Sequence, residues 1–307
     1  MPDACLKALA ANQKLRMGEF FSVACAAVWA LAVVMFRRSG ESLPAFELNL
    51  FKNTLGVLLL IPTVWLTEGL QPPDFDAQRW FIVLLSGVIG IAVADTWYLR
   101  ALNLMGAART GVVATMFSPF VILLSIAFLG EAMKAWQLAG FVLVLSGILL
   151  VTWRQKRQDI SMRALKAGVM YGAGAVLLMA IGIVMVKPVL EGEHFFWVVA
   201  LRLAAGSVVM LLLVVVRNNW SQVVARYREP QPWTTIIIAS ILASYVSMLL
   251  WLAGYRLTDA SIASVLNETA AAFIVLFAWL ILKEPLNLRR IGGVVLTFLG
   301  VWIIVIV

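Results

Sequence analysis

Charged residues are scarce in this sequence, and so are the residues that most often bind metals. Asp, Glu, Lys and Arg together account for 13% of the 307 residues, against about a quarter in a typical soluble domain. His194 is the single histidine, and Cys5 and Cys25 have no repeated spacing. These shortages exclude a multi-histidine site, a CxxC metal site and a disulfide framework, so we expect no metal and no cofactor.

The motifs of ATP-driven transport and of intramembrane catalysis are also missing. The Gly-Ala-Gly at 172–174 is not followed by the Lys-Ser/Thr of a Walker motif. No HExxH sequence, pair of aspartates or nucleophile with its base is evident. We therefore expect neither an ATP-driven pump nor an enzyme, whereas a receptor or assembly partner without transport stays open.

Apolar residues, by contrast, are abundant, at 63% of the chain with a mean hydropathy of +0.96. Uncharged runs of about 20 residues recur with short polar breaks, and this is the length that a helix needs to cross a bilayer. The pattern predicts an all-α integral membrane protein. Its ten transmembrane helices are expected at 17–36, 45–66, 80–101, 107–129, 134–153, 164–187, 194–216, 233–255, 259–282 and 286–306.

The basic residues predict how the chain is oriented. The net charge is +8, and of the 24 Lys and Arg residues seven belong to one face, fifteen to the other and two lie inside helices. Because basic loops stay in the cytoplasm, we expect a multi-pass protein of the cell (inner) membrane with both termini outside, and no nucleic-acid partner. Residues 1–16 are too polar for a cleavable signal, so we expect a loose tail there.

The chain repeats itself. A shift of 153 places Glu131 on Glu284, and a shift of 150 places Lys52 on Arg202. Each copy contains five helices, an odd number, so the second copy must cross the bilayer in the opposite sense, as in the inverted repeats of secondary transporters. The predicted parts are a tail at 1–16, a first repeat at 17–153, a basic linker at 154–163 and an inverted second repeat at 164–307.

The last two helices of each copy carry a recognisable pattern. The segments are PFVILLSIAFLGEAMKAWQLAGFVLVLSGILL and NETAAAFIVLFAWLILKEPLNLRRIGGVVLTFLG. Each has a helix rich in small residues, a G-E or K-E pair, a short turn and a last helix with glycines. Both resemble the EamA-type repeats of the drug/metabolite transporter superfamily. The resemblance implies a ten-helix carrier with a central cavity enclosed by the first four helices of each repeat, although Ala272 stands where the first copy has Pro119.

Four ionisable residues are clear cases of a charge well inside a predicted span, where a charge is costly and so points to function. Lys52 and Arg202 occupy matching positions. They either bind a carboxylate or phosphate from two sides, or they have a structural role. In the structural role, each side chain extends to the membrane interface or donates to a neighbouring carbonyl group. Asp95 and Glu268 either carry a proton or bind a substrate ammonium, or else they form a salt bridge that only holds the bundle together.

Further candidates surround these four residues. Asn49, Lys52 and Asn53 share one face of the second helix by their spacing, which predicts a wall of the cavity. The remaining candidate substrate-binding residues are Asn267 beside Glu268, Thr115 at the matching position of the first copy, and the aromatic residues Trp29, Tyr98, Tyr171, Tyr245 and Trp251. Ordinary packing and interfacial belts are the alternative explanation for the aromatic residues.

The repeated glycines and glutamates near the end of each copy are expected to be structural. Gly140 and Gly147 are seven residues apart, as are Gly293 and Gly300, so each pair lies on one helix face and suits close helix packing. Glu131 and Glu284 lie in short turns and are expected to cap helices or to set topology.

Together these features predict a secondary transporter that works by alternating access. We expect an exporter of amino acids or similar small polar metabolites, coupled to protons through Glu268 or Asp95, because cations and carboxylates together suit a zwitterion. The alternative is a carrier of drugs, sugars or nucleotides with the same fold. The expected partners are a small polar solute and membrane lipids, with the chain as a monomer or homodimer.

Overall fold

The computed structural model describes residues 2–38, 43–105, 107–152, 161–192, 194–283 and 288–306, and its regular elements within these ranges are helical. The first half contains α1 (Pro2–Arg38), α2 (Ala45–Thr67), α3 (Ala77–Gly87), the π-helical η1 (Val88–Val93), α4 (Ala94–Met105), α5 (Ala107–Ala114), α6 (Phe117–Leu129) and α7 (Ala135–Thr152). The second half contains α8 (Met162–Leu190), α9 (Phe195–Val216), α10 (Trp220–Arg228), α11 (Trp233–Ile241), the π-helical η2 (Leu242–Val246), α12 (Ser247–Leu257), α13 (Ala260–Asn267), α14 (Ala270–Leu282) and α15 (Leu288–Ile306).

These elements confirm the predicted fold class. Within the described ranges, nine helical stretches are long and apolar enough to cross a membrane, and α7 adds a shorter apolar helix at Ala135–Leu150. Each predicted span therefore coincides with a helix or with consecutive helical pieces. The third span consists of α3, η1 and α4, and the eighth consists of α11, η2 and α12.

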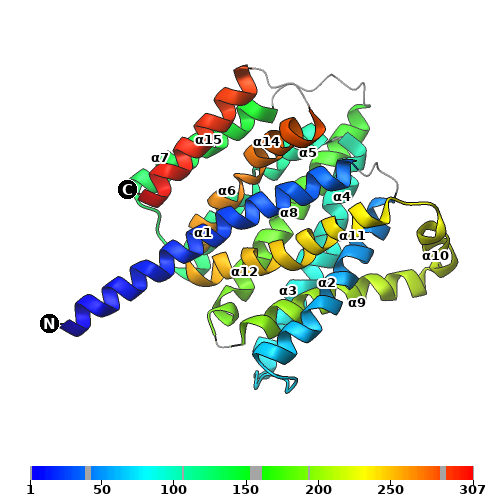
Figure 1. Cartoon of the computed structure of the whole chain (residues 1–307), viewed down its shortest axis with the longest axis horizontal. Helices are drawn as coiled ribbons and strands as arrows, with labels where there is room; N and C mark the ends of the chain where they lie inside the picture. Colours follow the sequence, from blue (N-terminus) through cyan, green and yellow to red (C-terminus); the bar gives the residue numbers. More distant parts are fainter. Residues whose placement is uncertain are drawn as a thin grey trace.

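Two segments differ from the expectation. The chain is helical from Pro2 and continues without a break into the first span, so residues 2–16 form the projecting start of α1 rather than a loose tail (Figure 1). The short helix α10, between the seventh and eighth spans, has no predicted counterpart. Of the predicted linker, residues 154–160 lie outside the described residues, and Ser161 accepts a hydrogen bond from the N–H of Ala164 at the start of α8.

The packing of the helices shows the inverted repeat directly. In the second half α8 packs on α4 and α6, and in the matching way α1 packs on α12 and α14. The α2 and α9 helices, which are second in their repeats, pack on one another, and so do the fifth helices α7 and α15, which lie side by side at one flank of the bundle (Figure 1). Such reciprocal packing is expected when a pseudo-twofold axis in the membrane plane relates two copies.

The helices also deviate from regular geometry at matching places. η1 and η2 both lie in the third helix of their repeat, and a shift of 153 superimposes most of their residues. The fourth helix is interrupted at Thr115–Met116 in the first copy and at Glu268–Thr269 in the second, again 153 residues apart. π-Helical turns are frequent at functional sites. A functional site is therefore expected near these matching irregularities.

Glycines bring α7 and α15 into close contact. A Cβ atom on Gly300 would lie 2.6 Å from the carbonyl oxygen of Gly140, and one on Gly140 would lie 2.7 Å from the carbonyl oxygen of Gly300. Backbones approach this closely only where side chains are absent. The structural role expected of these two glycines is therefore confirmed, whereas Glu284 lies outside the described residues.

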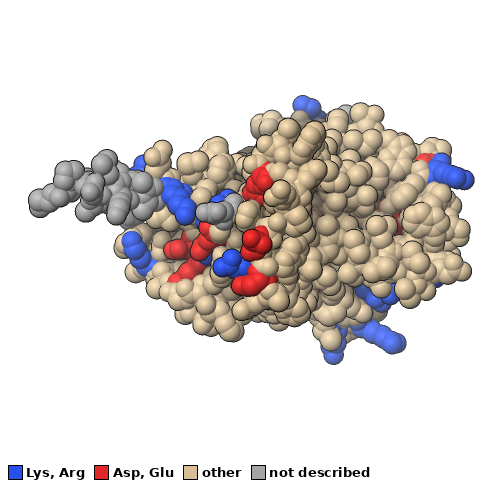
Figure 2. Space-filling view, turned by 90° about the horizontal axis from the view of Figure 1, so that it is seen from below, with Lys and Arg blue, Asp and Glu red and all other residues tan. Residues whose placement is uncertain are grey.

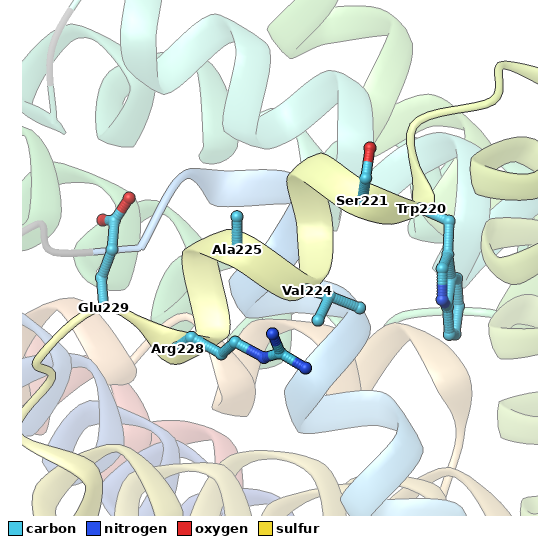
Figure 3. Close-up of a pocket in the computed structure, with 6 residues that line it drawn as sticks. All are labelled: Trp220, Ser221, Val224, Ala225, Arg228 and Glu229. Carbon is cyan, nitrogen blue, oxygen red and sulfur yellow. The ribbon is translucent and has the colours of Figure 1, made fainter.

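The α10 helix lies against the end of the bundle through one face. Val223 is buried there in a cluster with Met210 and Val214 of α9, and the Tyr227 hydroxyl donates to the carbonyl oxygen of Glu47 at 2.8 Å. Its outer side borders an open hollow of about 460 Å³, shown in Figure 3. The hollow is lined by Trp220, Ser221, Val224, Ala225, Arg228 and Glu229. The apolar and basic side chains of α10 are typical of a helix at a membrane surface.

Candidate functional site

The most prominent polar contact within the spans joins the second and third helices of the first repeat. The Lys52 ammonium of α2 lies 3.6 Å from the Asp95 carboxylate of α4. It also donates to the side-chain oxygen of Asn53 at 2.8 Å. Of the two ion-pair side chains, 13% of Lys52 and 26% of Asp95 remain exposed, so the pair is largely but not completely buried. Lys52 is therefore already neutralised by a carboxylate of the same repeat.

The polar stripe predicted on α2 faces protein, as expected. Asn53 donates through its amide nitrogen to the Asn49 oxygen at 3.1 Å and accepts from the Ser244 hydroxyl at 3.3 Å. The Asn49 amide in turn contacts the sulfur of Met210 on α9 at 3.6 Å. Because Ser244 belongs to η2, the stripe connects the second helix of one repeat to the π-helical turn of the other.

Glu268 stands at the interruption between α13 and α14. Its carboxylate accepts a hydrogen bond from the hydroxyl of Ser118, near the start of α6, at 3.0 Å. Within the described part of the chain, no Lys or Arg forms an ion pair with Glu268. The neighbouring Asn267 donates to the carbonyl oxygen of Ala263 at 2.8 Å, whereas its side-chain oxygen is buried without a partner. A carboxylate and an amide oxygen are thus available beside one helix break.

Tyr98 follows Asp95 by one helical turn on α4. The third helix of the first repeat thus contributes Asp95 and Tyr98, and the broken fourth helix of the second repeat contributes Asn267 and Glu268. We define the central polar cluster as Asn49, Lys52, Asn53, Asp95, Tyr98, Ser118, Ser244, Asn267 and Glu268.

Arg202 lies in different surroundings from Lys52, despite the matching positions. Its guanidinium donates to the Ser86 hydroxyl at 3.0 Å and to the carbonyl oxygen of Gly182 at 3.1 Å. The residue is only 1% exposed, and these partners belong to α3 and α8. These are buried hydrogen bonds that join three helices, and a structural role of this kind is one of the two roles predicted for Arg202 from the sequence. That Lys52 and Arg202 together bind one anion stays a prediction.

The other candidates are dispersed. Thr115 donates to Val112 of its own helix at 2.7 Å, and 37% of Trp29 is exposed. The Tyr245 hydroxyl lies 2.6 Å from the Thr63 hydroxyl. Trp251 packs edge-on against Tyr255 with ring centroids 5.4 Å apart, and Tyr171 packs against Trp97 at 5.9 Å. No described contact connects these five residues to the central polar cluster. The structure adds Ser118 and Ser244, of which Ser118 lies about one turn beyond the predicted Thr115.

Two glutamates of the first repeat hold helix starts of the second repeat at one end of the bundle. The Glu131 carboxylate accepts hydrogen bonds from the first two backbone N–H groups of α13, at 2.8 and 2.9 Å. The Glu68 carboxylate accepts from two backbone N–H groups in the first turn of α9, each at 3.0 Å. Carboxylates are favourable at the positive end of a helix dipole. The helix-capping role expected of Glu131 is confirmed. Both caps also join the first repeat to the second at this end of the bundle.

At the same end of the bundle, Lys187 caps the C-terminus of a helix. Its ammonium donates to the carbonyl oxygens of Tyr255 and Thr258, at 2.9 and 2.8 Å, where α12 ends. Between these caps lies Asp259, and burial, followed by the charge of Glu131, raises the pKa of its carboxyl group. Acidic and basic side chains intermix on the left of Figure 2. Charged contacts therefore hold this end of the bundle, between the repeats at Glu68 and Glu131 and within the second repeat at Lys187.

A second hollow lies on the surface near these caps. It has a volume of about 540 Å³ and is bordered by the loop before α3 and by the turn between α8 and α9. Its polar lining residues are Asp74, Asp76, Gln78, Arg79 and His194. Neither this hollow nor the one at α10 contains a predicted substrate-binding residue. The central polar cluster is thus the better candidate site.

The sequence profile of the EamA-like transporter family matches residues 16–153 and again residues 166–306. The chain belongs to the EamA-like transporter family. An uncharacterized transporter of Bacillus subtilis (strain 168), YvbV, is 25% identical over 227 residues, which cover 71% of this chain and 70% of the relative. The pseudopaline exporter CntI of Pseudomonas aeruginosa (strain UCBPP-PA14) is 23% identical over 287 residues, covering 92% and 93%.

A solved structure supports the fold of this EamA-like chain independently. A protein of known crystal structure superimposes on this chain with a TM-score of 0.75 at 16% sequence identity. The superposition covers 95% of this chain and 96% of the other. At that identity the likeness concerns the fold alone. The family match and the relatives together identify this chain as a transporter, and a transporter is the class expected from the inverted repeat.

Proposed function

We propose that this transporter is a secondary carrier that exports amino acids or similar small polar metabolites in exchange for protons. The observation that carries the proposal is the central polar cluster, in which an ion pair and a separate carboxylate remain partly exposed inside membrane spans. Ionisable groups at such depth mark substrate and proton pathways in membrane proteins. One of the relatives is named as an exporter of pseudopaline, which favours the export direction.

Alternating access supplies the mechanism. The cluster includes Ser244 of the π-helical turn η2 and Glu268 at the break between α13 and α14. Rocking of one repeat against the other exposes such a site to each side in turn. In the structure, the Glu68 and Glu131 caps join the repeats at one end. These caps must separate when that end opens. Glu268 takes up a proton when the site faces one side and releases it when the site faces the other.

Location and partners follow from the same proposal. The carrier resides in the cell (inner) membrane with both termini outside, because the cytoplasmic face should hold the larger number of basic residues. Its partners are the small polar solute and the surrounding lipids, and it works as a monomer or a homodimer.

Transport by the purified protein tests the proposal. Proteoliposomes would be offered radiolabelled amino acids with and without a pH gradient, using the unmodified chain, Lys52→Ala, Glu268→Gln and the surface control Glu229→Gln. We expect saturable uptake that the pH gradient accelerates, loss of this uptake in the first two variants, and no change in the control. Absence of uptake by correctly folded protein would contradict an amino acid carrier, and equal uptake by every variant would contradict the assigned site.

A further inference from the structure

The charges of the central polar cluster do not balance. Lys52 and Asp95 neutralise one another at 3.6 Å, and Lys52 is further held by Asn53. Arg202, the second cation of the spans, bonds Ser86 and a backbone carbonyl and has its Nε buried without a partner. It offsets the charge of no carboxylate in the cluster, and at 1% exposure it is not accessible to a substrate. Glu268 then contributes a carboxylate that no cation of the described residues compensates. With Glu268 ionised, the cluster has one negative charge in excess.

A substrate carboxylate finds no accessible cation without a partner in this arrangement, because the unpaired Nε of Arg202 is fully buried. It would have to displace Asp95 from Lys52, because Arg202 is sealed between α3, α8 and α9. A charge buried without a partner is strongly unfavourable in a membrane interior. An anionic group entering beside Glu268 and Asp95 would add like-charge repulsion to this cost. The cluster therefore discriminates against added negative charge.

For an ammonium group, by contrast, the cluster offers oxygen atoms that can accept further hydrogen bonds. An ammonium carries three N–H donors and no acceptor. Within the described residues, the Glu268 carboxylate is hydrogen-bonded by Ser118 alone, through its hydroxyl and its backbone, and the adjacent side-chain oxygen of Asn267 is buried without a partner. A buried acceptor left unpaired is costly, so a donor that satisfies it is favoured.

We propose that the carrier recognises the ammonium group of its substrate through Glu268 and Asn267, and that it does not require a carboxylate on the substrate. The inference rests on the proposed function and narrows its substrate class to primary amines and cationic amino acids. Since Glu268 is either protonated or paired with the ammonium, binding of one amine releases one proton. Exchange of a monovalent amine for a proton then moves no net charge.

Pairs of compounds that differ only in a carboxylate test this inference. Uptake of lysine would be compared with uptake of cadaverine, and arginine with agmatine, in proteoliposomes with an imposed pH gradient. We expect cadaverine and agmatine to enter at least as fast as their parent amino acids and to compete with them, and we expect glutamate to be excluded. Uptake of lysine without uptake of cadaverine would overturn the inference but keep the proposed function. No uptake of any amine or amino acid would overturn both.

Substitutions at Glu268 separate recognition from folding. Glu268→Gln should lower the uptake of cadaverine by at least about tenfold, as expected for truncation of a buried charge pair. Glu268→Asp retains the charge and should keep measurable uptake with a higher KM. Monodisperse size-exclusion profiles establish that both variants fold. Unchanged cadaverine uptake by folded Glu268→Gln would overturn the inference, as would a higher uptake of glutamate than of cadaverine by the unmodified chain.

Discussion

At the scale of single residues, Lys52 and Asp95 should stabilise the bundle mainly by being paired with one another. Removal of one partner from a buried ion pair costs about 3 kcal/mol or more, whereas removal of both can be nearly neutral. We therefore expect Lys52→Met to lower the melting temperature of the purified protein by roughly 5 °C or more. The double variant Lys52→Met/Asp95→Asn should recover most of this loss.

The single variant Asp95→Asn completes the double-mutant cycle for this pair. If the effects of the two single substitutions simply add in the double variant, the two side chains do not interact and the ion pair has no energetic role. Cadaverine uptake by the double variant adds a functional measurement. It should persist, because the excess negative charge at Glu268 is unchanged by removal of a neutral pair.

The residues of the site could be predicted only in part. The spacing of Asn49, Lys52 and Asn53 predicted a shared face, since helical periodicity is a local property. Which carboxylate pairs with Lys52, however, depends on how α2 and α4 are packed. The contrast with Arg202 has the same origin, because Ser86 and the carbonyl of Gly182 are supplied by other helices. A matching position in a repeat does not ensure a matching partner.

At the scale of helices, the contact between α7 and α15 should tolerate a methyl group at one glycine but not at another. A Cβ on Gly300 would lie 2.6 Å from the Gly140 carbonyl oxygen and 2.8 Å from the backbone nitrogen of Val144. A Cβ on Gly292 meets only the end of the Leu150 side chain, at 3.7 Å. Gly300→Ala should destabilise by about 1–3 kcal/mol through overpacking, whereas Gly292→Ala should be neutral or gain up to about 1 kcal/mol in helix propensity.

Thermal unfolding of both alanine variants provides the measurement for this prediction. Equal melting temperatures for Gly300→Ala and Gly292→Ala would mean that α7 and α15 are not in close backbone contact. A lower melting temperature for Gly292→Ala than for Gly300→Ala would contradict the register of the two helices. The pair is matched because both glycines lie on the same helix and receive the same additional methyl group.

Helix positions could be predicted well from the sequence, and helix irregularities could not. Apolar length alone located the spans, since the bilayer requires about 20 apolar residues. The π-helical turns and the interruption at Glu268 are set by contacts across the bundle and have no comparable local signal. The α10 helix was missed because nine residues between two spans are too few for a periodic apolar pattern to stand out.

At the scale of the whole molecule, the internal repeat implies a reciprocal arrangement of the two halves. Residues 150 or 153 apart have matching types, and an odd number of helices in each copy requires inversion. The reciprocal packing of α1 with α12 and of α8 with α4 follows from that inversion. The orientation of the molecule in the membrane, in contrast, depends on loop charges at its two ends.

Those loop charges allow a prediction about which end faces the cell exterior. The end with Gln78 has fewer basic residues than the end with Ser221, and both residues are exposed. Gln78 lies in the hollow beside His194, which precedes α9, whereas Ser221 follows the far end of α9, so the two residues mark opposite ends. Since the end richer in Lys and Arg stays in the cytoplasm, Gln78 should be outside together with both termini.

Cysteine labelling in intact cells distinguishes the two orientations. Cys25 is buried, so Cys5→Ser leaves a background suited to single introduced cysteines. A maleimide that cannot cross membranes should label Gln78→Cys in intact cells and label Ser221→Cys only after permeabilisation. The reverse pattern would place the termini in the cytoplasm. The end bound by the Glu68 and Glu131 caps would then face the cytoplasm, and the structure would represent a carrier closed toward the inside rather than toward the outside.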